Sequence, residues 1–207
     1  TYRFTPVDLD GSVARVAPRL ERIAAAARAA GVGICVDAEQ YETRDVVWAA
    51  WQRTFGAGGP HADWRGAGMV VQAYLRDADR HLDAVIDAAR RRGVPFQVRL
   101  VKGAYWDYET IVAAAQRWAP PVFQAKAATD QMYERLLDRL IAEADVVAPA
   151  VASHNPRAHA LAEALAAARG LPPGAVEHQT LHRTLEALSA ALAHRGWTAR
   201  DYVPVGD

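Results

Sequence analysis

The chain has 207 residues, of which 51% are hydrophobic, and its 24 basic side chains balance 24 acidic ones. This length suits one domain with a sizeable core, and the apolar content excludes wholesale disorder. The zero net charge argues against binding nucleic-acid phosphates through bulk charge, so no nucleic-acid partner is expected.

Targeting and redox signals are sparse. No apolar run approaches the roughly 20 residues of a membrane span, and the N-terminus lacks a signal-peptide pattern, so we expect a soluble chain. The single cysteine, Cys35, excludes an internal disulfide and paired-cysteine zinc sites. One thiol is consistent with a reducing compartment.

Six short apolar runs predict buried strands. They are rich in β-branched residues and nearly continuous in apolarity, as is typical of parallel strands that are covered on both faces. Pro149 and Pro204 weaken two of them, because proline removes a donor from the hydrogen-bond ladder. The runs are residues 32–37, 68–73, 96–101, 146–153, 175–179 and 202–205.

Amphipathic patterns between these runs predict helices over 12–30, 79–92, 129–144 and 182–195, and a further helix that starts at Asn155-Pro156. Asn155 is the expected N-cap of that helix, and Gly93 and Gly170 are expected to end helices. Pro18 favours a start of the first helix at that residue.

Strands that alternate with helices indicate an α/β fold with parallel strands. Two architectures stay open on this pattern, an open doubly wound sheet and a (β/α)8 barrel. The strand count suits the open sheet, since a barrel typically needs eight units and about 250 residues.

Polar residues cluster at the predicted strand ends, which form the active-site face in parallel α/β folds. For each of them the alternative is a helix cap or a solvated turn. That alternative is strongest for Asn155, whereas no clear helix follows Asp37 at once, which favours a functional role there. The residues are Asp37, Gln72, Tyr74, Arg99, Lys102, Ser153, His154, Asn155, Glu177, Gln179 and Tyr202.

Arg99 interrupts a run in which burial on both faces is expected. A buried arginine is costly without a partner, so either a structural ion pair or a bound ligand must satisfy it. Gly103-Ala104 then forms a small-residue turn in which backbone N–H groups can approach a bound group, and Tyr105 and Trp106 can wall a flat ligand.

Other site classes are absent from the sequence. It has no Gly-x-Gly-x-x-Gly after a strand, no Walker loop and no Gly-x-Ser-x-Gly elbow. The seven histidines show no metal-protease spacing, so no metal site is expected.

Residues 98–107 read Val-Arg-Leu-Val-Lys-Gly-Ala-Tyr-Trp-Asp, and this decapeptide resembles the flavin-binding core of the proline dehydrogenase family. The resemblance is strongest to the domain found in bifunctional proline-utilisation enzymes. It extends in the right order over the whole chain, residues 1–207, through Val-Asp-Ala-Glu-Gln at 36–40, Val-Val-Gln-Ala-Tyr at 70–74, Ser-His-Asn at 153–155, Glu-His-Gln at 177–179 and Tyr-Val-Pro-Val-Gly at 202–206.

The resemblance implies a distorted (β/α)8 barrel that holds FAD, with about six of its eight strands in this chain and the first two strands and last helix missing. The implied activity is oxidation of L-proline to Δ1-pyrroline-5-carboxylate by hydride transfer to flavin N5, the first step of proline catabolism to glutamate. The implied electron acceptor is a membrane quinone, and a fused aldehyde dehydrogenase domain is implied elsewhere in a longer polypeptide. The implied location is the cytoplasm, with peripheral contact at the inner face of the membrane.

Matching the family's motifs assigns roles by position. Arg99, beside flavin N5, and Asp37 are the implied catalytic residues, and Tyr105 and Tyr202 line the implied proline pocket. The resemblance also implies that Arg99 and Gln72 contact the isoalloxazine. The other implied cofactor-binding residues are Ala38, Val101, Lys102, Gly103, Ala104, Trp106, Lys126, Thr129, Ser153, His154, Asn155, Glu177 and Gln179.

The chain also departs from the family pattern. The strand that carries a substrate-binding lysine and the Arg-Arg-x-x-Glu helix that grips the proline carboxylate are not found in it, so we expect it to be part of a longer polypeptide. Phe123-Gln124-Ala125 replaces a stretch with threonine and arginine before Lys126, and His178 stands where relatives often carry phenylalanine.

Two alternatives to proline oxidation therefore remain. The chain could be a barrel fragment that binds flavin, or only folds, without proline turnover. It could also be a barrel enzyme in which Lys102 forms a Schiff base with a carbonyl substrate, because a desolvated strand-end lysine can act as a nucleophile.

Overall fold

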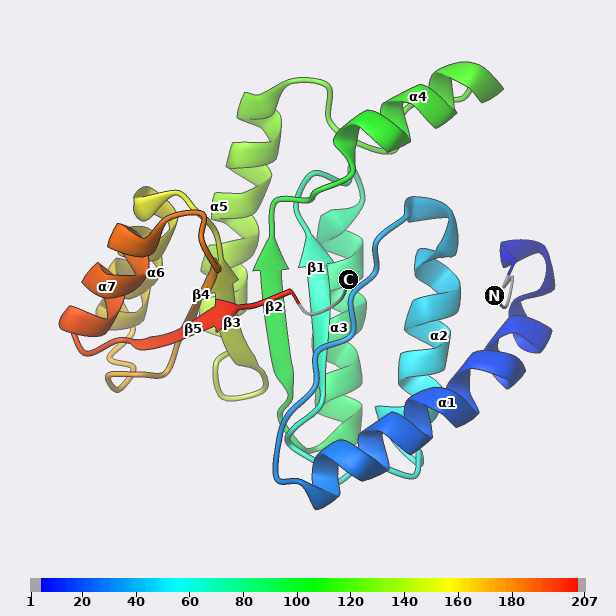
Figure 1. Ribbon diagram of the computed structural model, residues 1–207, viewed down its shortest axis with the longest axis horizontal. Coiled ribbons are helices and arrows are strands. Elements are labelled where there is room, and N and C mark those ends of the chain that lie inside the picture. Colours follow the sequence, from blue (N-terminus) through cyan, green and yellow to red (C-terminus); the bar gives the residue numbers. More distant parts are fainter. Residues whose placement is uncertain (1–4, 205–207) are drawn as a thin grey trace.

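Five parallel strands form one sheet in the computed structural model, which describes residues 5–204 (Figure 1). Each strand pairs with its neighbour in sequence, in the order β1-β2-β3-β4-β5. Parallel strands bring their carboxyl ends to the same edge of the sheet, so the polar strand ends share that edge. The strands are β1 Gly68–Gln72, β2 Gln97–Val101, β3 Ala148–Ala152, β4 Glu177–Leu181 and β5 Thr198–Tyr202.

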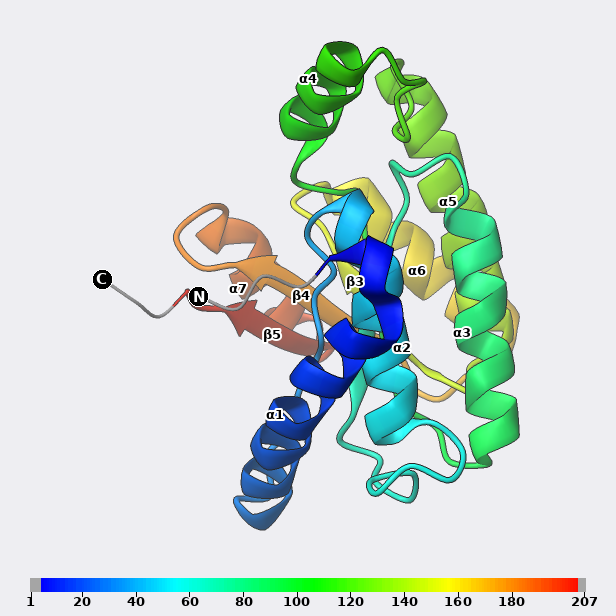
Figure 2. The same cartoon turned by 90° about the vertical axis from the view of Figure 1, so that its right-hand side faces the viewer.

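Helices connect the strands, and α3, α5 and α6 lie side by side along one face of the sheet (Figure 2). α1 and α2 pack against each other before β1, while α4 projects beyond the carboxyl end of β2 (Figure 1). The helices are α1 Leu9–Ala29, α2 Arg44–Phe55, α3 Ala78–Arg92, α4 Trp106–Gln116, α5 Lys126–Ala142, α6 Pro156–Ala168 and α7 Glu186–His194, with short 3-10 turns at Pro6–Asp8 and Tyr41–Thr43.

The core lies between the sheet and the helices that cover it. All five residues of β1 are buried, and the apolar stripes of α3 and α5 face the sheet, with Leu82, Ile86, Leu136 and Leu140 fully enclosed. Burial of such side chains contributes about 1.5–3 kcal/mol each. The core therefore fixes the strands from this face and leaves the carboxyl edge to the polar residues.

The prediction of a strand over residues 32–37 is wrong, because this segment forms only an isolated bridge. This segment runs beside β1, with Ile34 N donating to Gly66 O at 2.7 Å and Val36 N to Gly68 O at 3.0 Å, but only Val36 forms a bridge, with Met69. Within residues 5–204 this segment has a strand partner on one side only, so neither burial nor a full ladder holds it as a regular strand. The sheet consequently has five strands in the described residues, not six.

The last expected strand is shifted. β5 is Thr198–Tyr202, not 202–205, and all its residues are exposed. Continuous apolarity does not identify this strand, because within the described residues β5 pairs with β4 alone and all its residues are exposed. Pro204 follows the strand, and Val205 lies outside the described residues.

Pro149 lies inside β3 without breaking it. Ala148 N donates to Phe96 O on the β2 side, so the next residue, Pro149, turns its nitrogen toward β4. The ladder with β4 begins only at Ala150, opposite Glu177. The missing N–H of Pro149 therefore leaves no acceptor of the described sheet without its hydrogen bond.

The helix caps agree with the prediction in α3 and α6. Gly93 and Gly170 follow these helices with φ of 69° and 67°, and the Asn155 side chain accepts from Arg157 N at 3.0 Å. α1 begins at Leu9, however, and passes through Pro18 on its exposed face, where water can reach the carbonyl that proline leaves free.

Two other helix ends differ from the prediction. α5 covers Lys126–Ala142 rather than 129–144, and α7 begins at Glu186 rather than 182. Arg183 adopts φ of 59°, a left-handed conformation that a helix cannot include, so the turn after β4 delays α7. Among residues 5–204, no helix combines the length and apolarity needed to cross a membrane.

Candidate functional site

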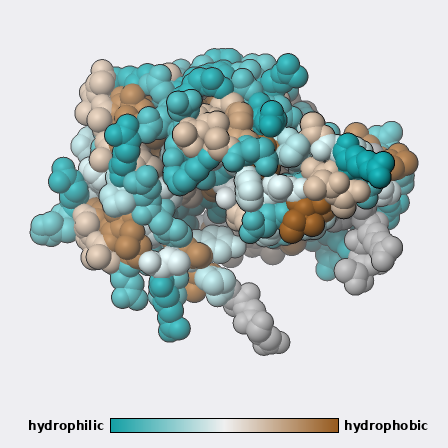
Figure 3. All heavy atoms as spheres, turned by 90° about the horizontal axis from the view of Figure 1, so that it is seen from above, coloured by the Kyte–Doolittle hydropathy of each residue, from teal (hydrophilic) through white to brown (hydrophobic). Residues whose placement is uncertain are grey.

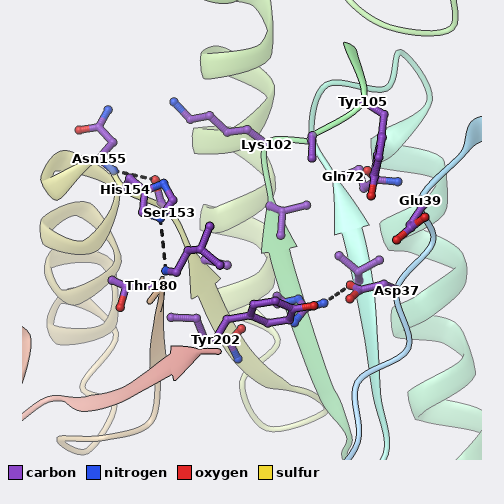
Figure 4. A pocket seen from close by; sticks show the side chains of 18 of the residues that line it. Asp37, Glu39, Gln72, Lys102, Tyr105, Ser153, His154, Asn155, Thr180 and Tyr202 are labelled. Atoms are coloured by element: carbon purple, nitrogen blue, oxygen red, sulfur yellow. Dashed lines mark hydrogen bonds and ion pairs between the residues drawn. The ribbon is translucent and has the colours of Figure 1, made fainter. Parts of the chain in front are cut away.

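A cavity of about 760 Å³ opens at the carboxyl ends of the strands (Figure 4). Figure 3, which looks down on this end of the molecule, shows a surface on which hydrophilic and hydrophobic residues are mixed. The cavity is lined by Asp37, Ala38, Glu39, Val70, Gln72, Arg99, Val101, Lys102, Gly103, Ala104, Tyr105, Lys126, Ala152, Ser153, His154, Asn155, Pro156, Gln179, Thr180, Leu181 and Tyr202.

Arg99 lies at the centre of β2 and is 8% exposed. Its guanidinium forms an ion pair with Asp37, and its centre lies 5.7 Å from the ring centroid of Tyr202. Within the described structure Arg99 Nε has no hydrogen-bond partner. The ion pair anticipated for a buried arginine is therefore present, and one buried donor is still unsatisfied at the cavity.

The loop after residue 36 forms the wall of the cavity next to β1. Gln72 donates from its side-chain amide to the carbonyl of Ala38, which holds the loop against the end of β1. Burial raises the pKa of Tyr105, and so does its hydrogen bond to Glu39, which lies beside it in Figure 4. The two residues join this loop to the start of α4.

Glu109 of α4 supports the same loop from behind. Its carboxylate accepts from the backbone N–H of Tyr41 at 2.7 Å, and the residue is 5% exposed. Burial raises the pKa of the Glu109 carboxyl. A buried acid is thus part of the connection between α4 and the cavity wall.

The turn after β2 requires glycine. Gly103 has φ of 126°, and a Cβ at this position would lie 2.4 Å from the ring of Tyr74. Burial of that tyrosine raises its pKa to about 12, so its ring forms a neutral floor beneath the turn. A larger residue at position 103 would therefore push against Tyr74 and shift the turn through which Gly103 and Ala104 line the cavity.

Two lysines share one carboxylate at the edge of the cavity. Lys102 Nζ lies 2.5 Å from Asp130 Oδ1, and Lys126 Nζ lies 2.6 Å from Asp130 Oδ2. The Lys102 and Lys126 ammonium groups hold the pKa of Asp130 below its usual range. Lys102 is ion-paired and its side chain is 29% exposed, so it lacks the desolvated environment expected of a Schiff-base nucleophile.

The segment after β3 lines the opposite side. Asn155 N donates to Ser153 Oγ at 3.0 Å, and Leu181 N donates to Nε2 of His154 at 3.3 Å (Figure 4). The Asn155 side chain caps α6, so its amide is committed to the helix as well as facing the cavity.

Three residues that the family resemblance assigned to the cofactor lie outside the cavity lining. Trp106 donates from Nε1 to the carbonyl of Phe123 at 2.9 Å, and Thr129 is buried in α5. Glu177, at the start of β4, pairs with Arg200 through contacts of 2.7 and 2.8 Å. Burial raises the pKa of Glu177, but Arg200 and Gln179 outweigh it and the pKa lies below its usual range. The cofactor roles of these three residues stay predictions.

Other residues at the cavity were not anticipated. Val70 lies two positions before Gln72 and Leu181 two after Gln179, so the alternation of a strand could have identified them. The spacing of Lys126 and Asp130 in α5 could have revealed their ion pair, although not the approach of Lys102 to the same carboxylate. Glu39, Ala152, Pro156 and Thr180 carry no comparable signal.

No group of three or more histidine, cysteine, aspartate or glutamate side chains is placed to hold a metal ion within the part of the chain that the structure describes. The polar groups at the cavity are the cations of Arg99, Lys102 and Lys126, the carboxylates of Asp37 and Glu39, and several amides and hydroxyls, a mixture that suits a large polar organic ligand.

A family model described as Proline dehydrogenase matches residues 3–207. The chain belongs to the proline dehydrogenase family. It is 32% identical over 213 residues to the Bifunctional protein PutA of Klebsiella aerogenes, covering 99% of this chain and 16% of that protein. It is also 30% identical to human Proline dehydrogenase 1, mitochondrial, of which it covers 34%, and 32% identical to bovine Hydroxyproline dehydrogenase, of which it covers 42%.

Solved structures agree with this membership in the proline dehydrogenase family. Proline utilization A from Bdellovibrio bacteriovorus, inactivated by N-propargylglycine, superimposes with a TM-score of 0.94 at 33% identity, over 98% of this chain and 21% of that one. The matched domains are (β/α)8 barrels, which confirms the barrel class, although the sheet is not closed in residues 5–204. The chain thus spans less than half the length of these relatives.

Proposed function

We propose that the protein containing this chain oxidises L-proline to Δ1-pyrroline-5-carboxylate with FAD as the hydride acceptor, as the first step of proline catabolism. The observation that carries the proposal is Arg99, a buried arginine in the middle of a strand that faces a large cavity and is held by Asp37. The family of the chain, proline dehydrogenase, supplies the substrate class.

The residues at the cavity fit a flavin in three respects. Arg99 Nε is a buried donor without a partner in the described residues, the small residues Gly103 and Ala104 line the cavity, and Lys102 and Lys126 supply positive charge for phosphates. The volume of about 760 Å³ is in the range of cofactor sites.

Each side chain then has a defined task. Bound FAD would accept a hydride from the ring carbon of proline. Arg99 places a positive charge in a buried setting, where it stabilises negative charge that develops on a bound ligand. Asp37 fixes the orientation of that guanidinium, and Gln72 lies within reach of the same part of the cavity. Tyr105 and Tyr202 form the walls of the substrate end, with Glu39 holding Tyr105 in place.

The proposal concerns the longer protein. Relatives named Bifunctional protein PutA are about six times as long as the matched region, since it makes up 16% of their length. This supports a fused aldehyde dehydrogenase domain in the parent of this chain. We further propose a quinone acceptor and a cytoplasmic location with peripheral contact at the membrane.

The test is an absorbance spectrum of the purified full-length protein, recorded without oxygen before and after addition of L-proline. Flavin bands that bleach with proline support the cofactor, the substrate and the hydride transfer together. Bands that persist contradict proline as substrate. A protein without flavin bands, even after FAD is added, contradicts the whole proposal.

Hydroxyproline is a second candidate substrate, because the bovine relative at 32% identity is named Hydroxyproline dehydrogenase. The same anaerobic experiment with trans-4-hydroxy-L-proline separates the two. Faster bleaching by proline at equal concentration supports the first proposal, and the reverse order supports the second.

A further inference from the structure

A buried chain of polar side chains lies behind the β3 side of the cavity. His159 of α6 and His178 of β4 are 1% and 0% exposed, and their Nδ1 atoms are 2.9 Å apart. His159 Nε2 lies 2.8 Å from the carbonyl oxygen of Ser153, and His178 Nε2 lies 2.7 Å from Glu163 Oε1. The chain therefore runs from Glu163 through two rings to a residue that lines the cavity.

The partners fix the number of protons in this chain. The Ser153 carbonyl can only accept, so His159 Nε2 carries a proton. One of the two facing Nδ1 atoms must carry a second, and the contact between His178 and Glu163 needs a third. Two neutral imidazoles carry only two such protons. The group of two histidines and one glutamate therefore holds one proton more than two neutral imidazoles and a carboxylate would carry.

The additional proton belongs to His178. Burial lowers the pKa of His159, which favours its neutral form with Nδ1 as an acceptor. His178 then donates from Nδ1 to His159 and from Nε2 to Glu163. The Glu163 side chain is 24% exposed, so water can also solvate its carboxylate, and we place the third proton on His178 Nε2 rather than on Glu163.

We propose that His178 is an imidazolium paired with the Glu163 carboxylate, and that this pair, acting through neutral His159, positions the Ser153 carbonyl and with it the Ser153–Asn155 wall of the cavity. His159, His178 and Glu163 are positioning residues, since within the described residues none of them lines the cavity. Insofar as the wall serves flavin, the inference rests on the proposed function.

Aromatic and charged groups also lie around the pair. Trp197 stacks on His178 with ring centroids 4.9 Å apart, and the Arg195 guanidinium lies 5.0 Å from the centroid of the Trp197 ring. His154, on the turn after β3, is the other titratable group that influences His159. In this setting the Glu163 carboxylate is the direct partner of the imidazolium.

Ser153 is also held by a second hydrogen bond, through its backbone N–H. Its backbone N–H donates to Gln179 O at 3.2 Å, so this residue joins the end of β3 to β4. The hydrogen bond from His159 fixes the other side of the same peptide segment. Loss of either contact would loosen the strand end that carries His154 and Asn155.

Two substitutions of Glu163 separate the charge from the hydrogen bond. In Glu163→Gln the amide can donate to His178 Nε2, so a neutral His178 satisfies every contact. In Glu163→Leu the His178 ring loses its partner. Glu134→Leu is the matched control, because Glu134 also pairs with α6, through Arg157 at 2.9 Å, but on the surface.

The first measurement is the ¹⁵N NMR spectrum of the histidine side chains in the full-length protein without added FAD, at pH 7. We expect both nitrogens of His178 to be protonated in the parent protein and only Nδ1 in Glu163→Gln, with His159 protonated at Nε2 in both. A neutral His178 in the parent protein, or a His159 protonated at Nδ1, overturns the proposal.

The second measurement tests positioning. Amide hydrogen exchange at Ser153 should be about tenfold faster in Glu163→Leu and within about twofold of the parent in Glu163→Gln and Glu134→Leu. The dissociation constant of FAD should follow the same order. If FAD does not bind the parent protein, the proposed function fails, but hydrogen exchange at Ser153 still tests the positioning role of Glu163. Equal exchange rates at Ser153 in all variants overturn that positioning role.

Discussion

Arg99 and Asp37 form the charged centre of the cavity, and their environments differ. The Arg99 side chain is 10% exposed, whereas that of Asp37 is 41% exposed. Both burial and the ion pair therefore hold the Arg99 side chain in place, whereas the position of the Asp37 side chain depends mainly on its ion pair with Arg99. A charge that is fixed before a ligand arrives needs no reorganisation when negative charge develops.

Arg99→Met should lower the rate of flavin reduction by proline about 100-fold, in line with the loss of one preorganised electrostatic contact. The methionine fills similar volume, so the barrel should stay folded. Arg44→Met is the control, since Arg44 forms an ion pair with Asp77 at 2.8 Å and its side chain is 14% exposed, away from the cavity. Stopped-flow absorbance gives the rates, and an unchanged rate in Arg99→Met would remove this residue from its proposed role.

Glu109 predicts a pH effect on stability. Its folded pKa is raised by burial, so the unfolded chain loses its proton first as pH rises above about 4.3, and the folded state is penalised. Glu109→Gln keeps an acceptor for Tyr41 N without the charge. We expect its Tm to exceed that of the parent by about 2 °C at pH 7, with the difference vanishing below pH 4.

Thermal unfolding followed by circular dichroism across this pH range checks the effect at Glu109. Asp145→Asn is a suitable control, because Asp145 is an exposed acid that does not influence the Glu109 carboxyl. A constant Tm difference between pH 4 and pH 7 would contradict the assignment.

Much of the site could be predicted at the residue scale, because polar residues at parallel strand ends converge by geometry alone. Arg99, Gln72 and Ser153 were identified in this way, and all of them line the cavity. Asp130 escaped prediction because it lies inside a helix, where the sequence gives no sign that a lysine from another element will approach.

At the scale of elements, the turn after β2 carries the sharpest steric demand. Gly103→Ala forces a side chain into φ of 126° and against Tyr74, whereas Gly93→Ala, at φ of 69°, has open space around its Cβ. The second substitution should cost about 1 kcal/mol of backbone strain. The first should lower the free energy of unfolding by about 2 kcal/mol more, since the turn must also move.

Urea denaturation measures both glycine variants, and the comparison isolates the clash from the backbone strain that they share. Equal losses of stability would mean that the Tyr74 ring gives way without cost. That result would contradict the interpretation that packing against Tyr74 fixes the turn at Gly103.

Element boundaries show where sequence patterns fall short. The helix stripes and caps of α3 and α6 were predicted because they follow local rules that hold wherever the helix lies. The strand predictions were wrong at both edges of the sheet, at residues 32–37 and at β5. A strand with one neighbour is defined by its partner more than by its own apolarity, and one sequence does not reveal its pairing.

At the scale of the molecule, apolar side chains are exposed where no other part of the described chain covers them. Ile111 of α4 and Trp118 just after it are 67% and 64% exposed. β5 also presents one unpaired side, since its described partner is β4 alone. Such an edge is a site for association between chains.

Residues 1–207 expressed alone should therefore self-associate, and Ala199→Pro should reduce it. Tyr202 O accepts from His182 N, so Tyr202 and its alternate neighbours face β4 and Ala199 turns its N–H outward. Proline there removes an edge donor without breaking the ladder. Sedimentation velocity gives the association, with Ala199→Val as control. Equal association of both variants would exclude the β5 edge.

The order of the strands has a consequence for how the protein is made. Spatial neighbours in the sheet are also successive in the chain, from β1 to β5. As the polypeptide leaves the ribosome, each new strand therefore meets a partner that is already complete, and no early segment must wait for a distant one. Synthesis from the N-terminus can build this sheet one βα unit at a time, so a ribosome stalled after α5 should already display β1 and β2 as a protected pair.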